Sequence, residues 1–251
     1  MEDLSLKPDQ KVDWRHISCH RELSEAFIEK HIDKVYWEYI SLYQKLSEAF
    51  IEKHSDNVDW RYISWGQDLN ETFIEKHCDK MNWRYISCYQ HLSEAFIEKH
   101  CDKVDWRYIS VWQKLSEAFI EKHRDKVRWG SISCWQKLSE AFIEKHYGRM
   151  QWEGISWHQK LSGTFIENNH SKVDWWMVSR YQKLSEPFIK KHHGKVWWVG
   201  ISKNKHLGEK MLANYFFVDD TFNMRRKELL RYVIFDLATL ITNCICITNH
   251  G

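Results

Sequence analysis

The 23-residue stretch Trp83–Asp105, WRYISCYQHLSEAFIEKHCDKVD, decides the fold because the chain repeats it in register. Tryptophan recurs every 23 residues without an insertion or deletion, at Trp14, Trp37, Trp60, Trp83, Trp106, Trp129, Trp152, Trp175 and Trp198. A fixed period of this length is the signature of a repeat architecture in which each repeat packs on its neighbours. We number the repeat from position 1, the Trp, to position 23, the residue before the next Trp.

The nearly fixed positions of the repeat have helical spacing. Positions 1, 4, 5 and 8 form one stripe on a helix, and positions 11, 14, 15 and 18 form a second. A strand reading of the alternating residues around the Trp fails, because position 3 should share the Trp face and instead becomes Ser131, Gly154, Met177 and Gly200. The sequence therefore predicts an all-α fold, an α-solenoid of about nine 23-residue helical-hairpin repeats with a C-terminal helical cap.

Capping residues mark where the two helices of each repeat begin. Position 23 is an acid or amide in five repeats, and position 11 is usually Ser followed by Glu, so both are suited to N-caps. We expect helices of about eight or nine residues, too short to be stable without stacking. The nine repeated Trp residues are then expected to fill the buried core between thin layers of helices.

The repeats occupy only part of the chain. Residues 1–13 match a shortened capping repeat, residues 14–212 hold the tandem repeats, and residues 213–251 form a C-terminal cap or docking helix. The C-terminal segment either covers the open end of the solenoid or docks on a partner, including a second copy of the chain. Arg231 and Asp236 interrupt its apolar run, which argues against a membrane span, and no secretory signal is recognised.

Composition and motifs argue against an enzyme. The chain has 37 Lys and Arg against 35 Asp and Glu, so its net charge gives no footprint for nucleic acid. Only 9 Gly and 2 Pro leave little turn chemistry for catalytic loops, and no nucleotide-binding or hydrolase motif occurs. His recurs at position 18 in seven repeats, one His to a repeat, which is too wide a spacing for zinc. We therefore expect no catalytic residues, no metal and no cofactor, and free thiols at the seven Cys.

Aromatic residues recur at the variable positions 3, 6 and 7 of the first helix. We call this set the aromatic stripe: Tyr39, Tyr43, Trp65, Tyr85, Tyr89, Tyr108, Trp112, Trp135, Trp157 and Tyr181. One interpretation is that these side chains pack between neighbouring first helices. The other is that they form an exposed surface, different in each repeat, that binds a protein. Stacking of nucleobases is a third interpretation, which the acidic residues between the lysines disfavour.

The motif W-x-x-I-S-x-x-Q-x-L-S-E-x-F-I-x-x-H-x-D-x-V is clearest over residues 37–127. It resembles tandem-repeat proteins encoded in many copies by large DNA viruses of amoebae, of the mimivirus and marseillevirus kind. The resemblance covers roughly residues 4–212. It implies a viral protein that acts in the host cytoplasm or is packed in the virion, and it carries over no catalytic residues.

Together these observations predict a non-catalytic repeat scaffold for protein–protein interaction, acting on host or viral partners. A structural component of a giant-virus particle is the alternative. A nucleic-acid-binding repeat protein is the second alternative.

Overall fold

The computed structural model describes residues 12–207, and within this range the chain consists of helices and contains no strand. Nine first helices alternate with eight second helices, which confirms the predicted all-α array of helical hairpins. The first helices are α1 (Trp14–His20), α3 (Trp37–Tyr43), α5 (Trp60–Gly66), α7 (Trp83–Tyr89), α9 (Trp106–Trp112), α11 (Trp129–Trp135), α13 (Trp152–His158), α15 (Trp175–Tyr181) and α17 (Trp198–Ser202). The second helices are α2 (Glu25–Lys30), α4 (Glu48–Lys53), α6 (Glu71–Lys76), α8 (Glu94–Lys99), α10 (Glu117–Lys122), α12 (Glu140–Lys145), α14 (Gly163–Asn168) and α16 (Glu186–Lys191).

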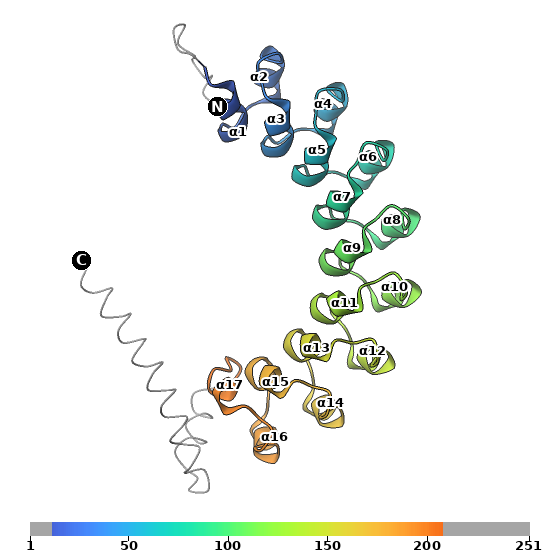
Figure 1. Cartoon of the computed structure of the whole chain (residues 1–251), viewed down its shortest axis with the longest axis vertical. Coiled ribbons are helices and arrows are strands. Elements are labelled where there is room, and N and C mark those ends of the chain that lie inside the picture. The colour runs from blue at the N-terminus through green and yellow to red at the C-terminus, as the bar shows by residue number, and fades with distance from the viewer. Residues whose placement is uncertain (1–11, 208–251) are drawn as a thin grey trace, which may run out of the picture. The chain divides into compact units, whose positions relative to one another are not determined.

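The chain divides into two compact units, an N-terminal unit of residues 1–128 and a C-terminal unit of residues 129–251. Within each unit the odd-numbered helices form one row on the inner side of a curve and the even-numbered helices form the outer row (Figure 1). Neighbouring first helices are in contact, for example α3 with α5 and α11 with α13. The cap predicted for residues 213–251 and most of the partial repeat predicted for residues 1–13 lie outside the described residues.

The helices are shorter than the eight or nine residues expected from the sequence, because the residue after each helix does not have helical backbone angles. A first helix such as α7 has seven residues and a second helix such as α8 has six, not the eight or nine expected. Gln90 ends α7 in an extended conformation. The caps are as predicted: Asn82 accepts a hydrogen bond from the backbone N–H of Tyr85, and Ser93 accepts one from Phe96.

Aliphatic residues, not Trp, form the fully buried core. Ile at positions 4 and 15 has no exposed surface in the repeats after the first, as Ile86 and Ile97 illustrate, and Leu92, Phe96 and Val104 complete the buried set of the same repeat. Eight of the nine repeated Trp residues are only partly buried, which corrects the expectation that they fill the core; Trp198 is buried.

The repeated indole ring lies at the edge of the core, between two other side chains of its own repeat. The ring of Trp106 stacks on Phe119, with ring centroids 6.2 Å apart, and Lys126 lies over it at 5.6 Å from the centroid. Its indole N–H donates to the carbonyl of Cys101 at 3.0 Å. Trp thus joins the two helices of a hairpin to the incoming loop, which explains why it recurs without being buried.

Buried polar side chains connect consecutive repeats. Ser87, at position 5, donates to the carbonyl of Trp83 at 2.6 Å and accepts from the backbone N–H of Asp105 at 2.9 Å. On the second helices, Glu98 accepts hydrogen bonds from Lys122 and His123 of the following repeat, at 2.9 and 3.0 Å. These contacts hold each hairpin at a fixed position on the next one, so the row of first helices presents its variable residues at regular intervals.

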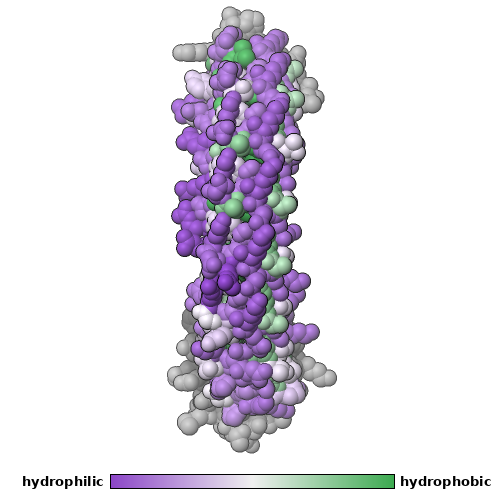
Figure 2. All heavy atoms as spheres, turned by 90° about the vertical axis from the view of Figure 1, so that its right-hand side faces the viewer, coloured by the Kyte–Doolittle hydropathy of each residue, from purple (hydrophilic) through white to green (hydrophobic). Residues whose placement is uncertain are grey.

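The outer face of each unit has a different character from the inner row. Figure 2 shows that hydrophilic side chains cover most of the face formed by the even-numbered helices. The exposed residues there come from the recurring sequence EAFIEK, whose Glu and Lys side chains pair between repeats, as Lys53 does with Glu29 at 2.6 Å. This face repeats almost unchanged, so the variation between repeats is concentrated on the first helices.

Candidate functional site

The aromatic stripe has exposed members at positions 6 and 7 and half-buried members at position 3, and Tyr181 at position 7 is also half-buried. At position 7, near the end of each first helix, Trp112 is 63% exposed, Trp135 is 60% exposed and Tyr43 and Tyr89 are exposed by more than half. Trp65 and Trp157, at position 6, are also exposed. Large apolar side chains that remain this open on a packed scaffold are available for contact with a partner.

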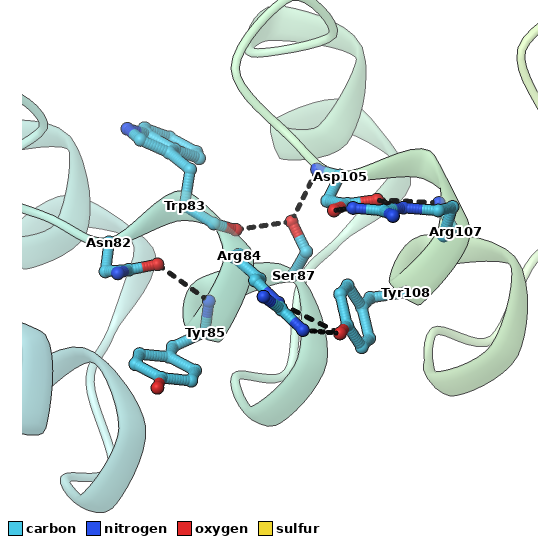
Figure 3. Close-up of polar contacts among 8 residues, drawn as sticks. All are labelled: Asn82, Trp83, Arg84, Tyr85, Ser87, Asp105, Arg107 and Tyr108. Atoms are coloured by element: carbon cyan, nitrogen blue, oxygen red, sulfur yellow. Dashed lines mark hydrogen bonds and ion pairs between the residues drawn. The ribbon is translucent and has the colours of Figure 1, made fainter.

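The tyrosines at position 3 are structural. Tyr39, Tyr85 and Tyr108 are half-buried. The hydroxyl of Tyr108 accepts two hydrogen bonds from Arg84 of the preceding repeat, at 2.9 and 2.7 Å, as Figure 3 shows. Arg15 makes the same pair of bonds to Tyr39. For position 3 the packing interpretation therefore describes the structure, because these rings lie between consecutive first helices.

In the N-terminal unit, the exposed rings gather where α5 meets α7. Trp65 stacks on Tyr85 with centroids 5.8 Å apart and lies 5.9 Å from Tyr89 of the same helix. The neighbouring Gly66 has no side chain at position 7, and a Cβ there would lie 2.7 Å from the carbonyl oxygen of Leu42. With Trp65 at position 6 and Gly66 at position 7, the exposed ring of this repeat therefore lies against α7.

In the C-terminal unit, the rings form a longer chain of contacts. Trp135 packs against His158 at 5.2 Å, His158 against Trp157 at 4.5 Å, and Trp157 against Tyr181 at 5.4 Å. The chain continues through Trp176, which lies 6.2 Å from Tyr181 and 5.4 Å from Trp197.

His158, Trp176 and Trp197 extend the surface beyond the predicted stripe. His158 lies at position 7, but the predicted stripe contains only Trp and Tyr side chains. The two Trp residues lie at positions 2 and 23. The signal in the sequence was the occurrence of Trp outside position 1. Position 3 in this unit carries Ser131, Gly154, Met177 and Gly200. A Cβ on Gly154 would lie 2.5 Å from Sγ of Cys134, so glycine permits the close approach of α11 and α13.

Two titratable groups beside the stripe are shifted toward their neutral forms. Desolvation raises the pKa of the Tyr89 hydroxyl, with a further contribution from the adjacent Cys88. Burial raises the pKa of the Cys134 thiol. The Tyr89 hydroxyl and the apolar ring faces of the stripe are groups typical of protein-binding surfaces.

The recurring histidines serve as links between the outer helices. His54, His77, His123 and His192 each lie within 3.4 Å of a Glu carboxylate on the preceding second helix. His100 is the exception: its Nε2 is buried without a hydrogen-bond partner, and desolvation lowers its pKa. Within residues 12–207 no group of three or more His, Cys, Asp or Glu is arranged to hold a metal ion, and the five cysteines described there are free thiols.

None of the described helices is both long and apolar enough to cross a membrane. Comparisons with protein families, with curated proteins and with solved structures find no match for this chain.

Proposed function

We propose that this protein is a non-catalytic scaffold that binds a protein partner through the exposed members of the aromatic stripe. The observation that carries the proposal is the exposure of Trp112 and Trp135 at 63% and 60%, at one repeat position in the row of first helices. Exposed Trp and Tyr are enriched among the residues that dominate binding energy at protein interfaces. Trp135 also packs against His158 at 5.2 Å, and this contact restrains the ring before binding and lowers the entropy that a complex must lose.

The distribution of variation among the repeats supports the same proposal. Positions 4, 5, 10, 14 and 15, which are buried, hardly change from repeat to repeat, whereas position 6 holds six residue types and position 7 holds five in the nine repeats. A solenoid that only had to be stable would have no need for exposed Trp and Tyr rings at these positions. A surface that recognises one extended partner needs different side chains along its length.

The resemblance of the motif to repeat proteins of amoebal viruses supplies the setting of the proposal. We infer a viral protein that acts on host or viral proteins in the cytoplasm of an infected amoeba or within the particle. The exposed aromatic surface fits either location, because both require a protein partner.

Site-specific photo-crosslinking tests the proposed function. The photoreactive residue p-benzoylphenylalanine would replace Trp112 or Trp135 on the first helices, and Ala118 or Ala141 on the second helices as controls, all four being exposed positions. In an amoebal lysate we expect one discrete protein adduct from positions 112 and 135 and none from positions 118 and 141. Equal labelling from both rows of helices would contradict the proposal.

A second variant separates recognition by the stripe from general stickiness. Tyr89→Ser, combined with the probe at position 112, should reduce the yield of the adduct. Tyr147→Ser should not, because Tyr147 is an equally exposed ring that lies at position 19, outside the stripe. If both substitutions reduced the yield to the same extent, the aromatic stripe would not be the recognition surface.

A further inference from the structure

An open hollow of about 530 Å³ lies in the N-terminal unit, lined by the start of α7, the loop that enters α9, the start of α9 and residues 126 and 128. Five of its lining side chains are basic and one is acidic: Arg84, Lys103, Asp105, Arg107, Lys126 and Arg128. We call this feature the basic groove. Its formal charge of +4, five positive and one negative, contrasts with the net charge of +2 for the whole chain.

The groove gathers residues that are far apart in the repeat. Arg84 and Arg107 come from position 2, Lys103 and Lys126 from position 21, and Arg128 from position 23. Position 2 is acidic in other repeats, as at Glu38, and position 23 is acidic in four. Positions 2 and 21 are also basic in other repeats, as at Arg61 and Lys80, so the groove combines recurring cations with Arg128, which occupies position 23 where four repeats have an acid.

Most of this charge is not neutralised within the protein. Arg107 pairs with Asp105, its guanidinium Nη2 lying 2.6 Å from the carboxylate, and Lys103 lies 3.8 Å from Asp79. Arg84 uses Nε and Nη2 for the neutral hydroxyl of Tyr108 (Figure 3), and among residues 12–207 it has no ion-pair partner. Lys126 lies over the ring of Trp106, and among residues 12–207 neither it nor Arg128 has an ion-pair partner.

We propose that the basic groove binds an acidic or phosphorylated segment of the protein partner, which rests on the proposed function of the stripe. Planar guanidinium groups donate pairs of hydrogen bonds that match the oxygen atoms of carboxylates and phosphates. Clusters of such groups are a recurring means of recognising phosphorylated and acidic peptides.

The groove and the stripe meet on α9. Tyr108 accepts the hydrogen bonds of Arg84 at the groove, and Trp112 lies one helical turn further along the same helix. A single extended segment can thus place its anionic residues against the guanidinium groups and its apolar residues against the exposed rings.

The Trp rings at the start of α7 and α9 are not open for stacking with nucleobases. Trp83 and Trp106 each stack on a Phe of their own repeat at 6.2 Å, and each has a Lys over the ring at 5.6 Å from the centroid. Sequence-tolerant binding of single strands depends on open aromatic faces along a continuous basic track. Glu38 at position 2 of α3 interrupts any such track within the N-terminal unit. A peptide is therefore the ligand that the groove favours.

Fluorescence anisotropy with three labelled ten-residue probes tests this inference on the full chain. The probes are a peptide of alternating phosphoserine and glycine, a peptide of alternating glutamate and glycine, and an oligothymidylate of ten nucleotides. The triple variant Arg84→Gln/Arg107→Gln/Arg128→Gln is compared with the charge-matched control Lys45→Gln/Lys114→Gln/Lys160→Gln, whose lysines are exposed at position 9. Far-ultraviolet circular dichroism checks that both fold, and the single variant Lys126→Glu replaces the triple variant if it does not.

We expect at least one peptide to bind the wild-type chain, with affinity that falls as salt is added. The triple variant should lose tenfold or more, since each charged hydrogen bond contributes about 1.5–3 kcal/mol and about 1.4 kcal/mol corresponds to tenfold. The control variant should change by no more than about twofold. Preference for one peptide identifies phosphate or carboxylate as the anion recognised.

Three results would overturn the inference: neither peptide binds, both variants weaken binding equally, or oligothymidylate binds more tightly than both peptides. The last result would assign the groove to nucleic acid. Photo-crosslinking at position 112 reports separately on the stripe, so a groove without affinity for anions leaves the proposed function standing. Peptide binding at the groove without any adduct at position 112 would instead contradict the proposed role of the stripe in partner binding.

Discussion

The side-chain amide of Gln90 donates a hydrogen bond of 2.7 Å to the backbone carbonyl of Gln67, one repeat earlier. Its Nε2 also donates to the carbonyl of Ser64, and its Oε1 accepts from the N–H of Leu69. One buried side chain therefore satisfies three backbone groups where a first helix ends and its loop begins, which explains the recurrence of Gln at position 8. At the start of the array, position 8 is Arg21, which is exposed.

Replacement of this amide should be costly. Gln90→Leu leaves two buried carbonyls and one N–H without partners, and each unsatisfied group costs about 1–3 kcal/mol. We expect the free energy of unfolding to fall by at least about 2 kcal/mol in urea denaturation, allowing for relaxation and for water reaching the loop. Arg21→Leu is the matched control and should change it by less than about 0.5 kcal/mol. Equal effects of the two substitutions would show that the Gln contacts do not stabilise the array.

Ser87 is a second buried connector whose loss we expect to be measurable. Ser87→Ala removes the acceptor of the Asp105 N–H and should lower the free energy of unfolding by about 1–3 kcal/mol. Ser131→Ala, at a partly exposed site on α11, should lower it by less than about 0.5 kcal/mol. Urea denaturation of both variants measures the difference. A cost for Ser87→Ala no larger than that of the control would mean that the hydrogen bonds in Figure 3 contribute little.

Acid should weaken the contacts between the outer helices. The hydrogen bond from Lys122 lowers the pKa of Glu98, and His123 adds to the effect. Because the folded-state pKa lies below the ordinary value of 4.5, this contribution to stability is present above that pH and is lost as the pH falls through the lowered pKa.

The substitution Glu98→Gln isolates this contribution. The variant should be less stable than the wild type at pH 7, and the difference should shrink as the pH is lowered from about 4.5 towards 3. Asp56→Asn, at an exposed site, should show the pH dependence of the wild type. Urea midpoints at each pH provide the measurement, and a difference that did not change with pH would contradict the role of the ionised carboxylate. Added salt should reduce the difference, because the pair is open to solvent.

The fold was predictable because the same sequence signals recur in nine repeats. Nine Trp residues in register, helical spacing of the fixed positions and capping residues such as Asn82 and Ser93 are all local signals, and the structure confirms the hairpins they predict. The burial of the Trp ring could not be predicted from the local sequence. Whether the indole of Trp106 lies inside the core or at its edge depends on Phe119 and Lys126 together, which no single position reveals.

The surface features were predictable only in part, for the same reason. Periodicity places positions 3 and 7 on one side of the first helix, but only packing shows that Tyr108 is held by Arg84 of another repeat while Trp112 remains open. The basic groove could not be predicted from the balanced total charge of the chain, because the fold brings together five cations from two consecutive repeats.

The exposed tryptophans provide the clearest test of whether the stripe exists for binding. Trp112→Ser and Trp135→Ser remove side chains that are 63% and 60% exposed, so each should change the free energy of unfolding by less than about 1 kcal/mol. Ile109→Ala, in the same helix as Trp112, removes a fully buried side chain and should cost about 2–5 kcal/mol. Urea denaturation of the three variants measures both values. If Trp112→Ser were as destabilising as Ile109→Ala, the ring would be needed for folding and its exposure would carry no functional meaning. If it is nearly neutral, stability does not explain why a large aromatic side chain occupies that position, and recognition of a partner does.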